Sequence, residues 1–266
     1  MPTESQYLTT QSADGTEIGY YVQGQGPALV ITHGSVGTAE DWRGTTAALE
    51  NDFTCYVYDR RGRAHSGDGN SYSMESEIAD IAALMNIAGP GASLLGHSYG
   101  GLCVLEYAQR HTIPGTLFLF EPPLPMHGPV AGPRLEDYRD AIAAGDNEKA
   151  IEIALVNFVE LPAEAIPHVR STPLWESIVP LAPTWTRELE QIDALGANTD
   201  RFSALSGRPT HVIAGTSTTG FLLESAHLLN RVIVDSTITE LPGLDHFAHI
   251  VDPQAFAQAV RQGHKG

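Results

Sequence analysis

Basic residues are scarce in this chain. Of its 266 residues, 15 are Lys or Arg and 32 are Asp or Glu, which gives a formal net charge of −17. Such a surplus of negative charge repels phosphate backbones and anionic membrane surfaces, so we expect neither nucleic acid nor a membrane as a partner. The one short basic cluster, Arg60, Arg61 and Arg63, is expected to pair with the chain's own carboxylates.

Cysteine is also scarce, with only Cys55 and Cys103 in the chain. One falls in a predicted strand and the other in a predicted helix, without the spacing of metal ligands, so we expect two buried thiols. The chain has no HExxH, CxxC or GxxxxGK motif, and its scattered histidines lack ligand-like spacing. We therefore expect no metal site and no cofactor.

Long hydrophobic runs are absent as well. Nowhere do eighteen apolar residues stand together, and residues 1–10 lack a basic region followed by an apolar one. This pattern predicts a soluble cytoplasmic protein. With 42% hydrophobic and 18% charged residues the composition is that of an ordinary globular domain, and it says nothing about oligomeric state.

Short apolar runs alternate along the chain with helical patterns. This alternation is typical of an α/β fold, in which helices cover both faces of a mostly parallel sheet. Eight strands are predicted, at 7–12, 16–22, 28–32, 53–58, 92–95, 116–120, 210–214 and 232–240. Helices are predicted at 41–49, 74–88, 101–109, 221–230 and 253–262. The first two strands form a hairpin through the turn residues Asp14 and Gly15.

One segment, residues 122–208, breaks the alternation. It shows no convincing buried strand but has helical patterns at 135–144, 148–159 and 184–195. Ligands of open α/β sheets bind outside the carboxyl ends of the strands, so an insertion after such an end would cover the crevice as a lid. We therefore predict a core formed by residues 1–121 and 209–266, with residues 122–208 as a helical lid.

The strongest motif is Gly96-His97-Ser98-Tyr99-Gly100, which follows a predicted buried strand and precedes a predicted helix. A serine at the tip of a tight turn from strand to helix has an exposed hydroxyl close to a helix N-terminus. Side chains at positions 96 and 100 would collide with the neighbouring elements, which explains both glycines. GxSxG alone is frequent by chance, but this context predicts that Ser98 is a nucleophile.

With this motif the chain resembles the α/β-hydrolase family over nearly its whole length. His33-Gly34-Ser35 looks like the family's oxyanion loop, and residues 59–66 look like its DxRGxGxS segment, with Ala64 in place of the second glycine. The resemblance implies that the backbone N–H groups of Ser35 and Tyr99 form the oxyanion hole. It also places His33 and Gly34 at the substrate, with His33 as an anchor of the loop rather than as a base.

The general base is sought after the last strand, where the family places its histidine. Two candidates stand there, His246 and His249, and a family-like helix start at Asp252-Pro253 lies at the distance expected from His246. A neutral imidazole would accept the serine proton as the bond to carbon forms. We favour His246; His249 is the alternative, or a histidine that packs under the final helix.

The usual acid is missing. The family commonly has Asp three residues after the Gly that ends the seventh strand, but residues 215–218 read Gly-Thr-Ser-Thr. Glu121 directly follows the sixth strand, and from there it could reach the far nitrogen of His246. The alternatives are that Glu121 only holds the start of the lid and that no acid exists.

These residues predict an enzyme that cleaves a carboxylic ester or C–C bond in a small, fairly apolar ester, lactone or related carbonyl compound. Residues 120–123 and the lid are also similar to those of small bacterial hydrolases. Phe158, Trp175 and Trp185 of the lid are candidates for substrate contacts, or simply pack within the lid. The missing Asp keeps two alternatives open: a ligand-binding protein, and a cofactor-free lyase, cyclase or dioxygenase that uses His246 alone as base.

Overall fold

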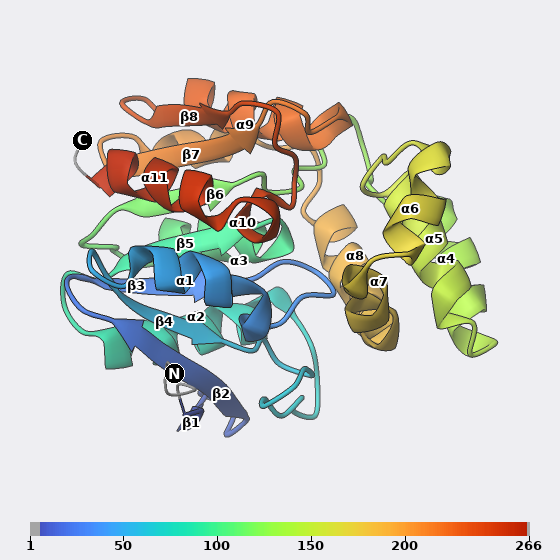
Figure 1. Cartoon of the computed structure of the whole chain (residues 1–266), viewed down its shortest axis with the longest axis horizontal. Coiled ribbons are helices and arrows are strands. Elements are labelled where there is room, and N and C mark those ends of the chain that lie inside the picture. Colours follow the sequence, from blue (N-terminus) through green and yellow to red (C-terminus); the bar gives the residue numbers. More distant parts are fainter. Residues whose placement is uncertain (1–5, 265–266) are drawn as a thin grey trace.

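The computed structural model describes residues 6–264 and places eight strands in one sheet (Figure 1). The strands are β1 (Leu8–Gln11), β2 (Glu17–Gly24), β3 (Ala28–Thr32), β4 (Thr54–Tyr58), β5 (Ser93–His97), β6 (Leu117–Phe120), β7 (Thr210–Gly215) and β8 (Thr237–Leu241). Their order is β1-β2-β4-β3-β5-β6-β7-β8. The first two pairs are antiparallel and the other five are parallel, which confirms the predicted mostly parallel sheet.

Helices cover both faces of the sheet, as predicted. Outside the segment between β6 and β7 they are α1 (Arg43–Leu49), α2 (Met74–Ala88), α3 (Tyr99–Arg110), α9 (Gly220–Val232), α10 (Ala248–Val251) and α11 (Pro253–His264). Alternate residues of β3 point to opposite faces, because the side-chain period of a strand is two. Val30 packs in one apolar cluster with residues of α2, α3 and α9, whereas Leu29 and Ile31 pack in a second cluster with residues of α1 and α11.

The start of the last strand was predicted wrongly. The prediction placed it at residue 232, but α9 runs through Val232 and β8 begins only at Thr237. Between them Asp235 has a φ of 69°, in the left-handed region, and this turn separates helix from strand. A strand was predicted here because residues 232–234 are β-branched. Tertiary packing instead places Val232 at the end of α9.

The connection from β6 to β7 contains helices and no strand. These helices are α4 (Arg134–Ala143), α5 (Asn147–Asn157), α6 (Ile166–Arg170), α7 (Pro173–Ile178) and α8 (Ala182–Ala194), with short 3₁₀ turns at 163–165, 179–181 and 200–205. The connection leaves from the carboxyl end of β6, and in Figure 1 the helices stand beyond that end of the sheet. The short helices α6 and α7 were not predicted, since neither is long enough to show a helical period.

The basic cluster of residues 60–63 joins this helical segment to the sheet. Arg60 is fully buried and contacts Glu77 of α2 at 2.6 Å and Glu188 of α8 at 2.9 Å. Arg63 pairs with the same Glu188 carboxylate. Burial acts to raise the pKa of Glu188, but the charges of Arg60 and Arg63 outweigh burial and hold that pKa below its ordinary value. The cluster therefore pairs with the chain's own carboxylates, as expected from the sequence.

Replacing this buried carboxylate is expected to destabilise the protein. Glu188→Gln leaves two buried guanidinium groups without their shared counter-charge, so we expect a loss of about 3–5 kcal/mol in the free energy of unfolding, measured by urea denaturation. The matched control is Glu190→Gln on the same helix, because Glu190 pairs with Arg139 and both side chains are exposed. An exposed pair is worth roughly 0–1 kcal/mol. Equal losses in the two variants would contradict the view that Glu188 stabilises the fold through Arg60 and Arg63.

Candidate active site

The chain reverses sharply at Ser98, between β5 and α3. Ser98 has φ 52° and ψ −127°, a strained conformation for a residue other than glycine. A Cβ at Gly100 would lie 2.3 Å from the carbonyl oxygen of His33, and one at Gly96 would lie 2.6 Å from the Cα of Gly101. Neither position admits a side chain. Within residues 92–100 only Ser98 is partly exposed, so the turn presents a single hydroxyl group.

Tyr99 and Ser35, whose backbone N–H groups are expected to form the oxyanion hole, both lie near Ser98. Tyr99 is the first residue of α3, so its N–H has no acceptor within the helix and lies at the positive end of the helix dipole. Ser35 follows β3 and lines the same cavity as Ser98. A Cβ at Gly34 would lie 2.9 Å from the Cβ of Ser98, which shows how closely this loop approaches the serine.

Both ring nitrogens of His33 make hydrogen bonds that hold this loop. Its Nε2 accepts a hydrogen bond from the Arg60 backbone N–H at 3.0 Å, which leaves Nδ1 to donate to the Gly34 carbonyl at 2.8 Å. Burial, and then the charges of Arg60 and Arg63, hold the pKa of His33 well below its ordinary value. His33 lines the cavity but has no free nitrogen to act as a base.

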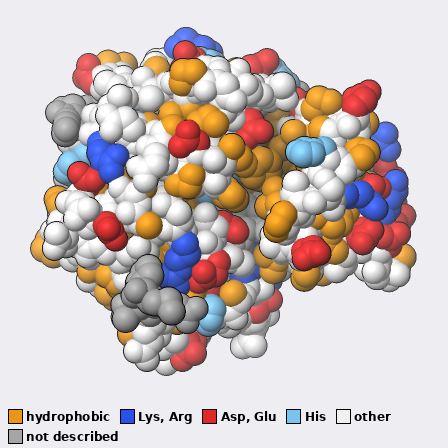
Figure 2. All heavy atoms as spheres, in the orientation of Figure 1, with side chains coloured by type: hydrophobic (Ala, Val, Ile, Leu, Met, Phe, Trp, Pro, Cys, Tyr) orange, Lys and Arg blue, Asp and Glu red, His pale blue; other side chains and the backbone are white. Residues whose placement is uncertain are grey.

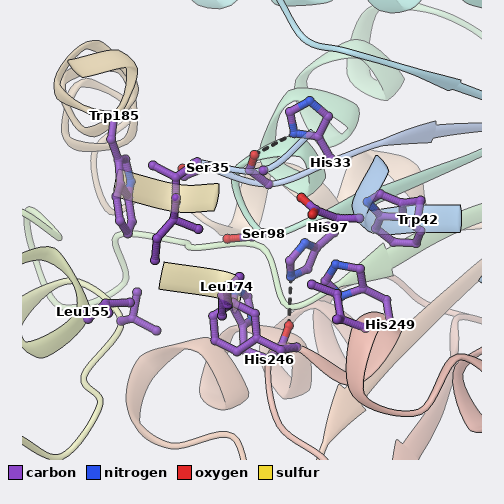
Figure 3. A pocket seen from close by; sticks show the side chains of 18 residues that line it. His33, Ser35, Trp42, His97, Ser98, Leu155, Leu174, Trp185, His246 and His249 are labelled. Carbon is purple, nitrogen blue, oxygen red and sulfur yellow. Dashed lines mark hydrogen bonds between the residues drawn. The ribbon is translucent and has the colours of Figure 1, made fainter. Parts of the chain in front are cut away.

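His246 contacts the carboxylate of Glu121. The distance from His246 Nδ1 to Glu121 Oε2 is 2.6 Å, although the two residues lie 125 positions apart in the chain. Because an ionised carboxylate only accepts hydrogen bonds, Nδ1 carries the proton and Nε2 is left with its lone pair. His246 and Ser98 line one cavity (Figure 3).

The loop after β7 does not supply a carboxylate to His246. It holds the carboxylate of Glu121 instead. Glu121 Oε1 accepts hydrogen bonds of 2.7 Å from the Gly215 backbone N–H and from the Thr218 hydroxyl. Thr218 stands at the position where the family commonly has its Asp. Glu121 is fully buried and has a φ of 47°, so it adopts a strained backbone at the end of β6 to reach His246.

His249 contacts aromatic rings and no carboxylate. Its ring stacks on Trp42 with centroids 4.5 Å apart and lies 4.4 Å from the ring of His97. Nδ1 is buried without a hydrogen-bond partner, and burial, followed by the proximity of His246, lowers the pKa of His249 to about 3. His246, with its carboxylate partner, therefore has the geometry of a base, and His249 does not.

Two cavities meet at Ser98 and His246. The first has a volume of about 50 Å³ and the second about 20 Å³, and both are lined by Ser35 and Trp185. Phe158 lines the second cavity. Figure 2 shows hydrophobic side chains along the recess between the sheet domain and the helices α4–α8. Trp175 is not among the residues that line either cavity; it is buried under Arg170, whose guanidinium lies 4.7 Å from the ring centre.

The sequence interpretation missed two residues of this site, Trp42 and His97. Both line the first cavity, and Figure 3 shows them on the same side of Ser98 as His249. His97 occupies the variable position before the nucleophile in GxSxG, so the sequence already indicated that it lies next to Ser98. The position of Trp42 depends on how the loop after β3 folds back, which no local pattern reveals.

Neither a metal cluster nor a membrane-spanning helix is found in residues 6–264. No group of three His, Cys, Asp or Glu side chains gathers there as metal ligands would, and no helix combines the length and apolar character needed to cross a bilayer. Cys55 and Cys103 are buried and free, as predicted. Burial raises the pKa of the Cys55 thiol to about 12.

A solved structure shares the fold of this chain, and curated proteins match part of its sequence. An alpha/beta hydrolase from Sphaerobacter thermophilus superimposes with a TM-score of 0.87 at 27% identity, over 96% of this chain and 99% of that one. The uncharacterized hydrolase YraK of Bacillus subtilis is 32% identical over 106 residues, which is 38% of this chain and 39% of YraK. A pimeloyl-[acyl-carrier protein] methyl ester esterase of Vibrio atlanticus is 38% identical over 93 residues, 35% of each chain.

These two curated relatives are thus matched over only about a third to two fifths of their length. The sequence profile of the alpha/beta hydrolase family, by contrast, matches residues 29–259, from β3 through most of α11. That range includes the sharp turn at Ser98, the Glu121–His246 pair and the helical connection between β6 and β7. The chain belongs to the alpha/beta hydrolase family.

Proposed function

We propose that this protein is a serine hydrolase that cleaves a small, fairly apolar ester or lactone without a cofactor. Ser98 is the nucleophile, His246 the general base and Glu121 the acid that orients the base. The observation that carries the proposal is the 2.6 Å hydrogen bond from His246 Nδ1 to Glu121, since it leaves Nε2 as the proton-free nitrogen of a neutral imidazole that lines the same cavity as Ser98. The similarity to a named methyl ester esterase supports the same class of reaction.

In the first step the Ser98 hydroxyl attacks the substrate carbonyl carbon while His246 Nε2 takes its proton. Glu121 stabilises the imidazolium that forms, and its own hydrogen bonds from Gly215 and Thr218 hold its carboxylate in place. The N–H groups of Tyr99 and Ser35 bind the oxyanion, each contributing about 3 kcal/mol to the barrier reduction. His246 then protonates the leaving alcohol, and water hydrolyses the acyl-enzyme by the reverse sequence of proton transfers.

We further propose that residues 122–208 act as the lid of this site. Leu155 and Val159, Leu174 and Ile178, and Trp185 bring apolar surface from this segment to the first cavity. A cavity of about 50 Å³ has room for roughly three to five water molecules, which suits a small acyl or alcohol group. Excluding water from the rest of the site strengthens the electrostatic stabilisation of the oxyanion.

A serine-directed phosphonate tests the nucleophile directly. Incubation with a small alkyl fluorophosphonate, followed by mass measurement of the intact protein, is expected to show one adduct, located on Ser98 by peptide mapping. Ser98→Ala is the matched control and is expected to remain unmodified. An unmodified wild-type protein after prolonged incubation, or an adduct that persists in Ser98→Ala, would refute Ser98 as the activated serine.

A further inference from the structure

The residues that line the first cavity differ in polarity between the two sides of Ser98. Figure 3 shows Trp185 and Leu155 on one side, and Trp42, His97 and His249 on the other. Asp41 lines the same cavity, and the side chains there that come from residues 122–208 are all apolar or aromatic. The proposed hydrolysis uses Ser98, His246 and Glu121, so the mechanism leaves His97, His249 and Trp42 unexplained.

The tautomer of His97 is fixed by the protein. Its Nε2 lies 3.0 Å from the His246 carbonyl oxygen, and a carbonyl only accepts, so Nε2 carries the proton. Burial, followed by the proximity of His249 and His246, holds the pKa of His97 well below its ordinary value, so the ring is neutral. The remaining nitrogen, Nδ1, is therefore a hydrogen-bond acceptor. It would lie 3.1 Å from a Cβ at Gly34, which places it next to the loop that faces Ser98.

Two neighbouring polar groups have no partner. The indole N–H of Trp42 and the Nδ1 of His249 are both buried and make no hydrogen bond, although their rings stack on each other. Trp42 is fully buried and His249 is 3% exposed. Leaving a buried polar group without a hydrogen bond destabilises a protein, so two such groups on stacked rings that line the cavity with Ser98 point to a ligand that satisfies them.

We propose that Trp42, His97 and His249 form a polar subsite that binds an uncharged hydroxyl group of the substrate, on the side of the scissile bond opposite Trp185. This inference rests on the proposed esterase function and narrows its substrate to hydroxy esters. A hydroxyl both donates and accepts, and so it suits a subsite whose unpartnered groups are the donor of Trp42 and the Nδ1 of His249, with the acceptor of His97 beside them.

A carboxylate does not suit this subsite. Among residues 6–264, no Lys or Arg lines the cavity, and Asp41 already contributes a carboxyl group to it. Burial raises the pKa of Asp41, against the lowering effect of a hydrogen bond from the Thr38 backbone N–H. A second carboxylate from the substrate would face the same penalty, so half-esters of dicarboxylic acids are expected to be poor substrates.

Matched esters test the subsite. The first pair is methyl 3-hydroxybutyrate and methyl 3-methylbutyrate, which exchange a hydroxyl for a methyl on the acyl side. The second pair is 2-hydroxyethyl butyrate and propyl butyrate, which do so on the alcohol side. A hydrogen bond worth about 1–1.5 kcal/mol corresponds to roughly tenfold in kcat/KM, so we expect at least that preference for the hydroxy ester in one pair. Monomethyl succinate is expected to be the poorest substrate. A ratio within twofold in both pairs would overturn the subsite and indicate that water occupies it.

Substitutions in the subsite test which residues cause the preference for hydroxy esters. His249→Phe keeps an aromatic ring beside Trp42 but removes both nitrogens, and it is expected to bring the hydroxy-to-methyl ratio close to one. His249→Gln, which retains a donor and an acceptor, is expected to keep most of the ratio. His127→Phe is the matched control at an exposed histidine, and it is expected to leave the ratio unchanged. The ratio is informative because a general loss of activity lowers both esters alike.

Binding separates this inference from the proposed function. Dissociation constants for the same pairs, measured by NMR titration of Ser98→Ala, do not depend on turnover, and we expect the same tenfold preference. If the wild-type protein hydrolyses no ester but Ser98→Ala shows this preference, the subsite stands and the esterase proposal fails. If the wild-type protein hydrolyses both members of each pair equally, the esterase proposal stands and the subsite fails. Equal binding without hydrolysis would refute both.

Discussion

Ser98→Ala is expected to lower kcat for ester hydrolysis by on the order of 10⁶-fold, and His246→Ala by a similar factor. The two losses are alike because the serine hydroxyl is a weak nucleophile without its base, and the base has no proton to accept without the serine. Steady-state kinetics on a small methyl ester measure both variants. The double variant is expected to be no slower than either single one, since the two residues act as one unit.

The same comparison separates covalent from base-only chemistry. In a lyase or dioxygenase that uses only an imidazole, Ser98→Ala would retain most of the activity while His246→Ala would lose it. That outcome, together with absence of a phosphonate adduct, would replace the proposed hydrolysis. His249→Gln provides the matched histidine control, because His249 has no carboxylate partner and should not show the loss expected at His246.

Glu121→Gln is expected to lower kcat by about 10⁴-fold, the second largest effect. The amide is nearly isosteric, so the hydrogen bonds from Gly215 and Thr218 keep an oxygen acceptor. The amide NH₂ would then face His246 and favour the tautomer that is protonated on Nε2, which cannot accept the Ser98 proton. The measurement is kcat at a pH near 8, alongside a urea unfolding curve to show that the variant is folded.

The chain offers a rescue that a purely structural role of Glu121 would not predict. Thr218 contacts Glu121 directly and stands at the position where other family members carry their Asp. Thr218→Asp in the Glu121→Gln background is therefore expected to raise kcat at least tenfold above that of Glu121→Gln alone, because it returns a carboxylate to the neighbourhood of His246. Glu160→Gln is the control carboxylate, as it contacts the start of α9 on the surface. No recovery in the double variant combined with full activity of Glu121→Gln would mean that no acid is used.

The alternation of buried strands and helical patterns, and the strained turn at Ser98, were readable from the sequence. Both depend on interactions between residues close in the chain: a strand, then a turn that tolerates only glycine on either side of Ser98, then a helix. The parallel order also implied that residues after β3, β5, β6 and β8 meet at one edge of the sheet. The sequence therefore determined where the proposed site lies and which serine is proposed as its nucleophile.

The tertiary structure decided which histidine has a carboxylate partner. Nothing local distinguishes His246 from His249, three residues apart, until Glu121 is found 2.6 Å from one and Trp42 stacked on the other. Trp175 and Trp185 looked equivalent as lid aromatics, but only Trp185 lines the cavities. These outcomes depend on contacts between segments that are distant in the chain, and a side chain's direction there is set by packing and by the conformation of loops, which leave no periodic trace in the sequence.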